Sequence, residues 1–224
     1  MVTGSEAELT IDEKNVMGYL GYSADVEPSG RISSLIEEYV KEAYHVIEPS
    51  YTCTTRDIEY VDGSNVYIEG SIVFQSEVIA RLLERCRKIS LFVVTIGNHL
   101  GEVANQLAEA GLIVQSYVLD AIGSDAVEKL ACFVQELITD KVRAEGLVAS
   151  RRVSPGCCDL DISHQGILFQ AVNAQSIGVH LTEDNLIVPE KSLSGIVGLG
   201  SMDSDLANYN PCETCNRANC PWRR

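Results

Sequence analysis

The sequence lacks the features that would place it in a membrane or on a nucleic acid. No apolar run approaches the roughly 20 residues of a membrane-spanning helix, and Met1–Glu6 lacks the basic and apolar parts of a signal peptide. Basic side chains are scarce, since 17 lysines and arginines accompany 32 acidic residues and give a formal charge of −15. Such a surface repels phosphate backbones. We therefore expect a cytoplasmic protein with no membrane and no nucleic acid as partner.

The sequence also shows no pairing of a nucleophile with a general base. Its 224 residues, 46% of them hydrophobic, suffice for one large domain or two small ones with a sizeable core. In a cytoplasmic chain the 8 cysteines are not expected to form disulfides. Three are scattered and are interpreted as core residues: Cys53, Cys86 and Cys132. The other five form two groups: Cys157 and Cys158, and Cys212, Cys215 and Cys220.

A turn at residues 151–159 is the most distinctive local feature. Pro155 fixes one φ angle and Gly156 frees the next, which indicates a tight turn of defined shape. Arg151 and Arg152 precede this turn and Asp159 follows it. An open backbone beside a guanidinium suits a small ligand that carries a carboxylate. A simple connection between helices, with a solvated arginine pair, is the alternative that these residues leave open.

Periodicity predicts a mixture of helices and strands around this turn. Helices are expected at residues 15–22, 32–47, 76–88 (capped by Ser76), 98–110, 112–143 (bent near Gly123, with Asp125 capping its second half) and 163–172 (capped by Ser163). Strands are expected at 57–61, 65–74, 89–95, 177–181 and 191–200. Small residues in the last strand indicate close approach by another backbone or a ligand. The chain divides into a flexible N-terminus (1–12), one main domain (13–204) and a Cys-rich tail (205–224).

Five segments follow one another along the chain: 119–128, Arg152-x-x-x-Gly156, Leu181-Thr182-Glu183, Pro189 and Ser192-x-Ser194-Gly195. Together they resemble the activation domain of cobalamin-dependent methionine synthase, in its small stand-alone form, over roughly residues 13–200. It implies an α+β fold in which a twisted antiparallel sheet is flanked by helices.

The resemblance also implies a function. A protein of this kind binds S-adenosylmethionine beside the Arg-x-x-x-Gly turn and supports the reductive methylation of a corrinoid, within a methionine synthase-like methyltransferase system. The sequence contains no corrinoid-binding segment, so the cobalamin would be held by a methyltransferase subunit in trans. An electron donor protein would supply the one electron that reduces it.

Site residues follow from the same resemblance. Arg152 would pair with the carboxylate of the ligand, and the backbone from Val153 through Ser154 to Gly156 would bond its polar edges. Glu128 or Glu136 would meet its α-amino group. Cys157 stands where the family has a tyrosine that contacts the ligand.

The C-terminal tail carries a second motif. Cys212-x-x-Cys215, followed by Cys220, has a spacing typical of metal and iron–sulfur sites. Cys157 or Cys158 would supply a fourth thiolate if the tail folds back to the turn. An iron–sulfur cluster, a zinc ion and three reduced thiols on a flexible end all remain open. The tail thus supports an alternative function, a non-catalytic metal- or iron–sulfur-carrying interaction module that keeps the fold without the ligand site.

Overall fold

A curled antiparallel sheet forms the centre of the computed structural model, which describes residues 2–5, 7–23, 25–220 and 223. The main path of the sheet runs β4-β3-β2-β5-β9-β6, and β1 also pairs with β2. Its strands are β1 (Val2–Gly4), β2 (Ser50–Asp62), β3 (Asn65–Ile68), β4 (Ile72–Gln75), β5 (Cys86–Thr95), β6 (Leu147–Ala149) and β9 (Ser192–Ser201). A separate hairpin joins β7 (His180–Leu181) to β8 (Ile187–Val188).

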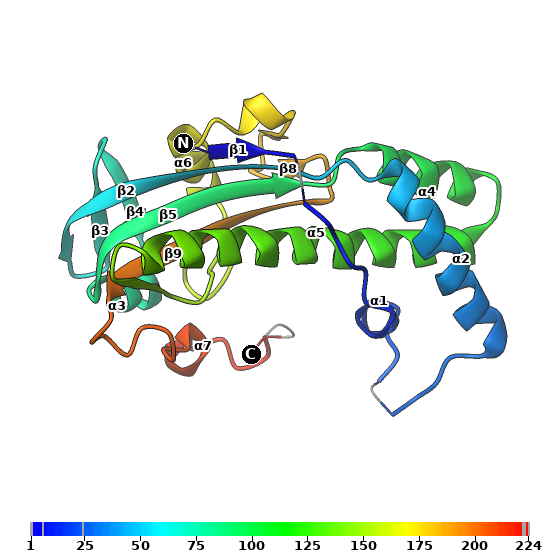
Figure 1. Cartoon of the computed structure of the whole chain (residues 1–224), viewed down its shortest axis with the longest axis horizontal. Helices are drawn as coiled ribbons and strands as arrows, with labels where there is room; N and C mark the ends of the chain where they lie inside the picture. Colours follow the sequence, from blue (N-terminus) through cyan, green and yellow to red (C-terminus); the bar gives the residue numbers. More distant parts are fainter. Residues whose placement is uncertain (1, 6, 24, 221–222, 224) are drawn as a thin grey trace.

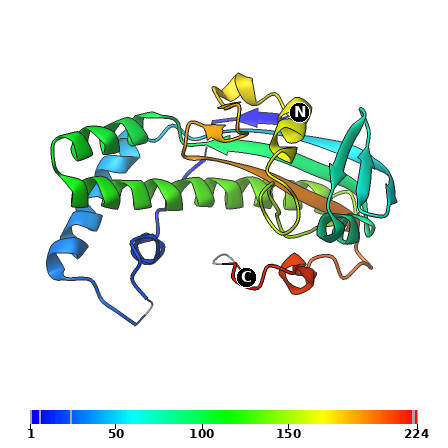
Figure 2. The same cartoon turned by 180° about the vertical axis from the view of Figure 1, so that it is seen from behind.

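Helices lie on both faces of the sheet (Figures 1 and 2). They are α1 (Glu13–Tyr19), α2 (Gly30–Val46), α3 (Glu77–Leu83), α4 (His99–Glu109), α5 (Ile113–Arg143), α6 (His164–Ala171), α7 (Pro211–Thr214) and the 3-10 helix η1 (Ala174–Ile177). Figure 1 shows α5 running lengthwise along one face, while α1, α2 and α4 gather at the end of α5 that projects beyond the strands. The expected α+β fold, a twisted antiparallel sheet flanked by helices, is confirmed.

Strand β5 connects the two hydrophobic cores of the molecule. Residues 89–95 are all buried, and their side chains alternate between the faces of the sheet. Phe92 and Val94 enter the core beneath α5, whereas Leu91 and Val93 enter the core covered by α3 and α6. Burial on both faces explains why this strand has a continuous apolar sequence rather than an alternating one.

Several expectations about single elements are wrong. The helix expected at 76–88 ends at Leu83, and residues 86–88 belong to β5. The strand expected at 65–74 is two strands, β3 and β4, because Gly70 and Ser71 adopt positive φ angles and turn the chain between them. Helix α5 is continuous through Gly123, and Asp125 is buried against α1 instead of capping a second half. Of the strand expected at 177–181, only β7 forms.

The expected helix caps at Ser76 and Ser163 and the expected loose N-terminus have different outcomes. Ser76 caps α3 by accepting a hydrogen bond from the Ile79 N–H, as expected. Within the described part of the chain, Ser163 makes no such bond at the start of α6. The N-terminal segment expected to be loose contains β1, which pairs with β2.

No helix among the described residues combines the length and the apolarity needed to cross a lipid bilayer.

Candidate ligand-binding site

Arg152 and Glu128 form a largely buried ion pair between the turn and α5. Arg152 Nη2 lies 2.5 Å from Glu128 Oε1, and only 11% and 25% of the two side chains is exposed. The other terminal nitrogen, Arg152 Nη1, is buried and has no hydrogen-bond partner within the described residues. A buried donor without a partner is costly, by about 1–3 kcal/mol. Arg152 Nη1 can therefore donate a hydrogen bond to one further acceptor.

The backbone around Arg152 is fixed by strand β9. Val153 exchanges both backbone hydrogen bonds with Ile196, at 3.0 and 2.8 Å. Ser154 Oγ donates to the Ser194 carbonyl at 2.7 Å. A side chain at Gly195 would collide with the Phe92 ring and would lie 2.9 Å from Arg152 Cδ. The small residues of β9 permit the expected close approach. Gly195 in particular leaves space for the side chains of Arg152 and Phe92.

The turn itself is closed by its own hydrogen bonds. Gly156 has φ +89° and donates its N–H to the Leu160 carbonyl at 2.8 Å. Cys157 N–H donates to the Ser154 carbonyl at 2.9 Å, and the Cys157 side chain is exposed. The sequence correctly indicated a tight turn, but these backbone groups already have partners within the chain.

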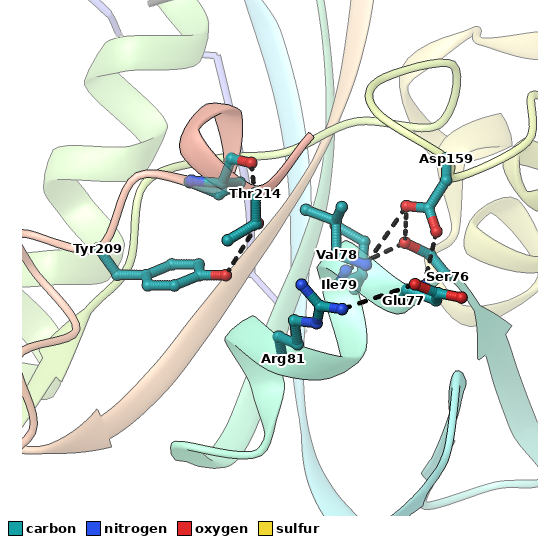
Figure 3. A network of polar contacts seen from close by, with 9 residues as sticks. Ser76, Glu77, Val78, Ile79, Arg81, Asp159, Tyr209 and Thr214 are labelled. Carbon is teal, nitrogen blue, oxygen red and sulfur yellow. Dashed lines mark hydrogen bonds and ion pairs between the residues drawn. The ribbon is translucent and has the colours of Figure 1, made fainter. Parts of the chain in front are cut away.

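Asp159 joins the turn to the start of α3 (Figure 3). Its carboxylate accepts hydrogen bonds from Ser76 Oγ at 2.5 Å and from the Glu77 N–H at 2.6 Å. Burial alone would raise the pKa of Asp159, but the hydrogen bonds from Ser76, Glu77 and Val78 outweigh burial and lower it. Sequence reasoning placed Asp159 after the turn and missed this role, although Ser76 was recognised as a cap.

The acidic residues of α5 have separate partners. Asp120 pairs with Lys191 Nζ at 2.7 Å, and Asp125 accepts the Asp12 N–H at 2.7 Å. Of the two candidates for the ligand's amino group, Glu128 lies against Arg152, whereas the exposed Glu136 lines two cavities beside Cys132. Sequence reasoning missed the largely buried Lys191. The signal that could have indicated it is Gly123, where a side chain would lie 3.3 Å from Lys191.

The tail folds back onto the turn. Arg217 Nη1 donates to the Gly156 carbonyl at 3.1 Å. The thiols of Cys158 and Cys215 are hydrogen-bonded, and Cys212 is close enough to affect the ionisation of Cys158. Burial, together with these neighbouring thiols, raises the pKa of Cys158 to about 12. The tail thus folds back to the turn, which is what a fourth thiolate from Cys157 or Cys158 would require.

Within the described residues, no three His, Cys, Asp or Glu side chains are already arranged to hold a metal ion. All eight cysteines are free thiols, and Cys212, Cys215 and Cys220 are half-buried. The assignment of these three residues as metal ligands stays a prediction.

A cavity lies elsewhere, between β2 and the C-terminal half of α5. It has a volume of about 580 Å³ and an apolar wall that includes Val134, Ile138 and Leu199. Arg56 lies at this cavity, and its Nε is buried with no hydrogen-bond partner among the described residues. Two further cavities, of about 430 and 510 Å³, flank α5 near Cys132. These spaces are separate from the turn.

Comparison with known proteins identifies the fold. No family model matches the sequence, and no curated protein matches it. Among solved structures, the chain is similar to the crystal structure of the MetH reactivation domain bound to AdoHcy, with a TM-score of 0.66. The two are 15% identical, and the match covers 87% of this chain and 75% of that chain. This chain has the fold of the MetH reactivation domain.

Within the MetH reactivation fold, the arrangement at Arg152 suits a zwitterion. A guanidinium with one nitrogen on a carboxylate can bind a second carboxylate through its other nitrogen. Glu128, in the same pair, is an acceptor for an ammonium group. Amino-acid recognition is thus the chemistry that this pair is best able to perform.

Proposed function

We propose that this protein binds S-adenosylmethionine and supports the reductive methylation of a corrinoid held by a partner methyltransferase in trans. The observation that carries the proposal is the buried Arg152 Nη1, which has no partner among the described residues and lies beside Glu128. It occurs in the fold of a domain whose crystal structure contains AdoHcy.

The residues of this chain would hold and orient the methyl donor. Arg152 Nη1 would donate to the carboxylate of the methionyl group, and Glu128 would accept from its ammonium group. The backbone of the turn from Val153 to Gly156, with Cys157 at the position of the family tyrosine, would border the sulfonium and the sugar. The protein is expected to contribute only by positioning the reactants, which can lower the activation barrier by about 7–11 kcal/mol.

A methyl group leaving the sulfonium needs an acceptor that another protein brings. We infer a corrinoid methyltransferase subunit, in a methionine synthase-like system, and a separate electron donor, all within the cytoplasm. The surplus of acidic residues, 32 against 17, favours a partner with a basic docking face.

Titration calorimetry of the full chain with S-adenosylmethionine tests the proposal. We expect saturable binding that Arg152→Gln weakens about 10- to 100-fold, the loss of one charge-assisted contact. Arg151→Gln is the matched control, because Arg151 is adjacent and exposed. Circular dichroism establishes that both variants fold. Absence of binding by the wild-type chain, or equal affinity of the two variants, would contradict the proposal.

One observation favours a second function, an interaction module that carries a metal ion or iron–sulfur cluster on Cys212, Cys215 and Cys220. The Gly156 carbonyl, a candidate ligand contact, is already bonded to Arg217 of the tail. The same calorimetry, combined with metal analysis of anaerobically purified protein, separates the two. A metal-loaded chain that does not bind S-adenosylmethionine supports the module, and a metal-free chain that binds it supports the methyl-donor site.

A further inference from the structure

The tail is held against the rest of the molecule by contacts that begin before its cysteines, at Arg85 between α3 and β5. The Tyr209 ring lies 5.0 Å from the Arg85 guanidinium carbon, and the Tyr209 hydroxyl is 3.3 Å from Thr214 Oγ1 (Figure 3). Asn210 caps α7 by accepting the Cys212 N–H at 3.1 Å. Tyr209 thus holds the start of the Cys212-x-x-Cys215 segment at Arg85, and Arg217 holds the chain after it at Gly156 in the turn.

Arg223 keeps the loop that follows α7 compact. Its guanidinium donates to the carbonyls of Cys212 at 2.8 Å, Cys215 at 3.1 Å and Arg217 at 2.6 Å. The Arg223 N–H also donates to the Cys220 carbonyl at 3.3 Å. One arginine thus draws together the backbone at all three cysteines of the tail.

The two adjacent cysteines of the turn differ in where they lie. Cys157 is exposed, whereas Cys158 is half-buried and its thiol contacts that of Cys215. Cys158 also has φ +53°, a conformation that residues other than glycine seldom adopt. Such strain persists where the surrounding structure requires it, and here it accompanies the contact between Cys158 and the tail.

We propose that Cys158 joins Cys212, Cys215 and Cys220 in a four-thiolate site for a soft metal centre, which fastens the tail to the turn. Four cysteines, two of them spaced Cys-x-x-Cys, are a ligand set of structural zinc sites and of iron–sulfur clusters. The Cys158–Cys215 contact is the part already formed, and metal binding draws in the other two thiols. On binding a divalent ion, the four thiols release their protons to solvent and the ion balances part of the thiolate charge.

This site has a consequence for the turn, because Cys158 is only two residues beyond Gly156. Metal occupancy would hold the Arg152–Gly156 segment and the tail as one unit. The metal site itself is independent of the methyl-donor function, since none of its ligands is Arg152 or Glu128.

Cobalt titration of the full, reduced chain under anaerobic conditions tests the site. We expect one Co²⁺ per chain, with the sulfur-to-cobalt charge-transfer and tetrahedral d–d absorption of a thiolate site, displaced by zinc. Cys158→Ser and Cys215→Ser should each weaken binding at least about tenfold, because a ligand is lost. Cys157→Ser, the matched control, should bind as the wild type does. A second arm reconstitutes the chain with iron and sulfide, and acid-labile sulfide with visible absorption identifies a cluster rather than zinc.

Either metal in a site that depends on Cys158 supports the inference. It is overturned if the wild-type chain takes up neither cobalt nor a cluster, or if Cys157→Ser abolishes binding while Cys158→Ser does not. Circular dichroism of the metal-free variants separates a lost ligand from a lost fold. Because the readout is absorption without any methyl donor, the metal site and the proposed function can fail independently.

Discussion

Arg152 owes its position to a neighbour that has no side chain. Gly195 lies in β9, where a Cβ atom would collide with the Phe92 ring and come within 2.9 Å of Arg152 Cδ. The guanidinium can reach Glu128 because its aliphatic part occupies this space. Gly195 therefore positions Arg152, although Gly195 itself is not among the residues proposed to contact the ligand.

Gly195→Ala should consequently destabilise the fold and displace Arg152. We expect a loss of about 1–3 kcal/mol in the free energy of unfolding, the usual cost of overpacking, measured by urea denaturation. Gly101→Ala is the matched control, since Gly101 lies within α4 and an added methyl group there would have no neighbour within 4 Å. The control should be stabilised by about 0.5–1 kcal/mol. If Gly195→Ala proved as stable as the wild type, the close packing described at Gly195 would be contradicted.

A second residue-level prediction concerns the buried Asp125. Only 1% of Asp125 is exposed, and it accepts the Asp12 N–H at 2.7 Å and a hydrogen bond from Asn15 Nδ2 at 2.9 Å. Asp125→Ala leaves both donors without this partner and should cost about 2–4 kcal/mol. Asp140→Ala, on the exposed side of α5, should change stability by no more than about 0.5 kcal/mol. Thermal unfolding of the two variants provides the measurement, and similar losses in both would contradict the role of Asp125 in anchoring α1.

Among the secondary-structure elements, α3 depends on the turn for its first hydrogen bonds. The lowered pKa of Asp159 means that this carboxylate stabilises the fold when ionised. Its contribution is complete above the ordinary value of 3.8 and is lost as the pH falls through the lower folded value. Asp159 thus connects the stability of α3 to that of the turn at residues 151–159.

Asp159→Asn should therefore destabilise the chain by about 1 kcal/mol at neutral pH, the scale of a helix cap on an exposed side chain. The difference from wild type should shrink as the pH falls below about 3.8, because the wild-type carboxyl becomes protonated. Urea denaturation across this range is the measurement, with Asp184→Asn in the exposed β7–β8 turn as control. A difference independent of pH would contradict the assignment.

The elements also show what sequence reasoning achieves and where it stops. Local signals identified α2, β5 and the Ser76 cap, because periodicity and capping act over a few residues. The bend expected at Gly123 was wrong, because this glycine instead leaves space for Leu100 and Lys191, which are distant in the sequence. The motif at Arg152 made it a candidate, and only the packing of α5 shows that Glu128 and not Glu136 lies beside it. Tertiary contacts decide these points, and a single sequence does not contain them explicitly.

For the molecule as a whole, ligand binding should appear as increased stability. At a concentration one hundred times its dissociation constant, a ligand that binds only the folded state contributes about 2.7 kcal/mol. For a chain of 224 residues, this corresponds to a rise in Tm of roughly 5–11 °C. We expect this shift with S-adenosylhomocysteine, measured by scanning fluorimetry. Arg152→Gln at the same ligand concentration should lose about half of the shift or more, given its 10- to 100-fold weaker binding. An unchanged shift in that variant would place the ligand elsewhere.

A crystal structure of the full chain with S-adenosylhomocysteine tests the central claim most directly. We expect the ligand carboxylate at about 3 Å from Arg152 Nη1, with the ammonium group of the ligand at Glu128. A ligand bound instead in the cavity of about 580 Å³ between β2 and α5, beside Arg56, would contradict it.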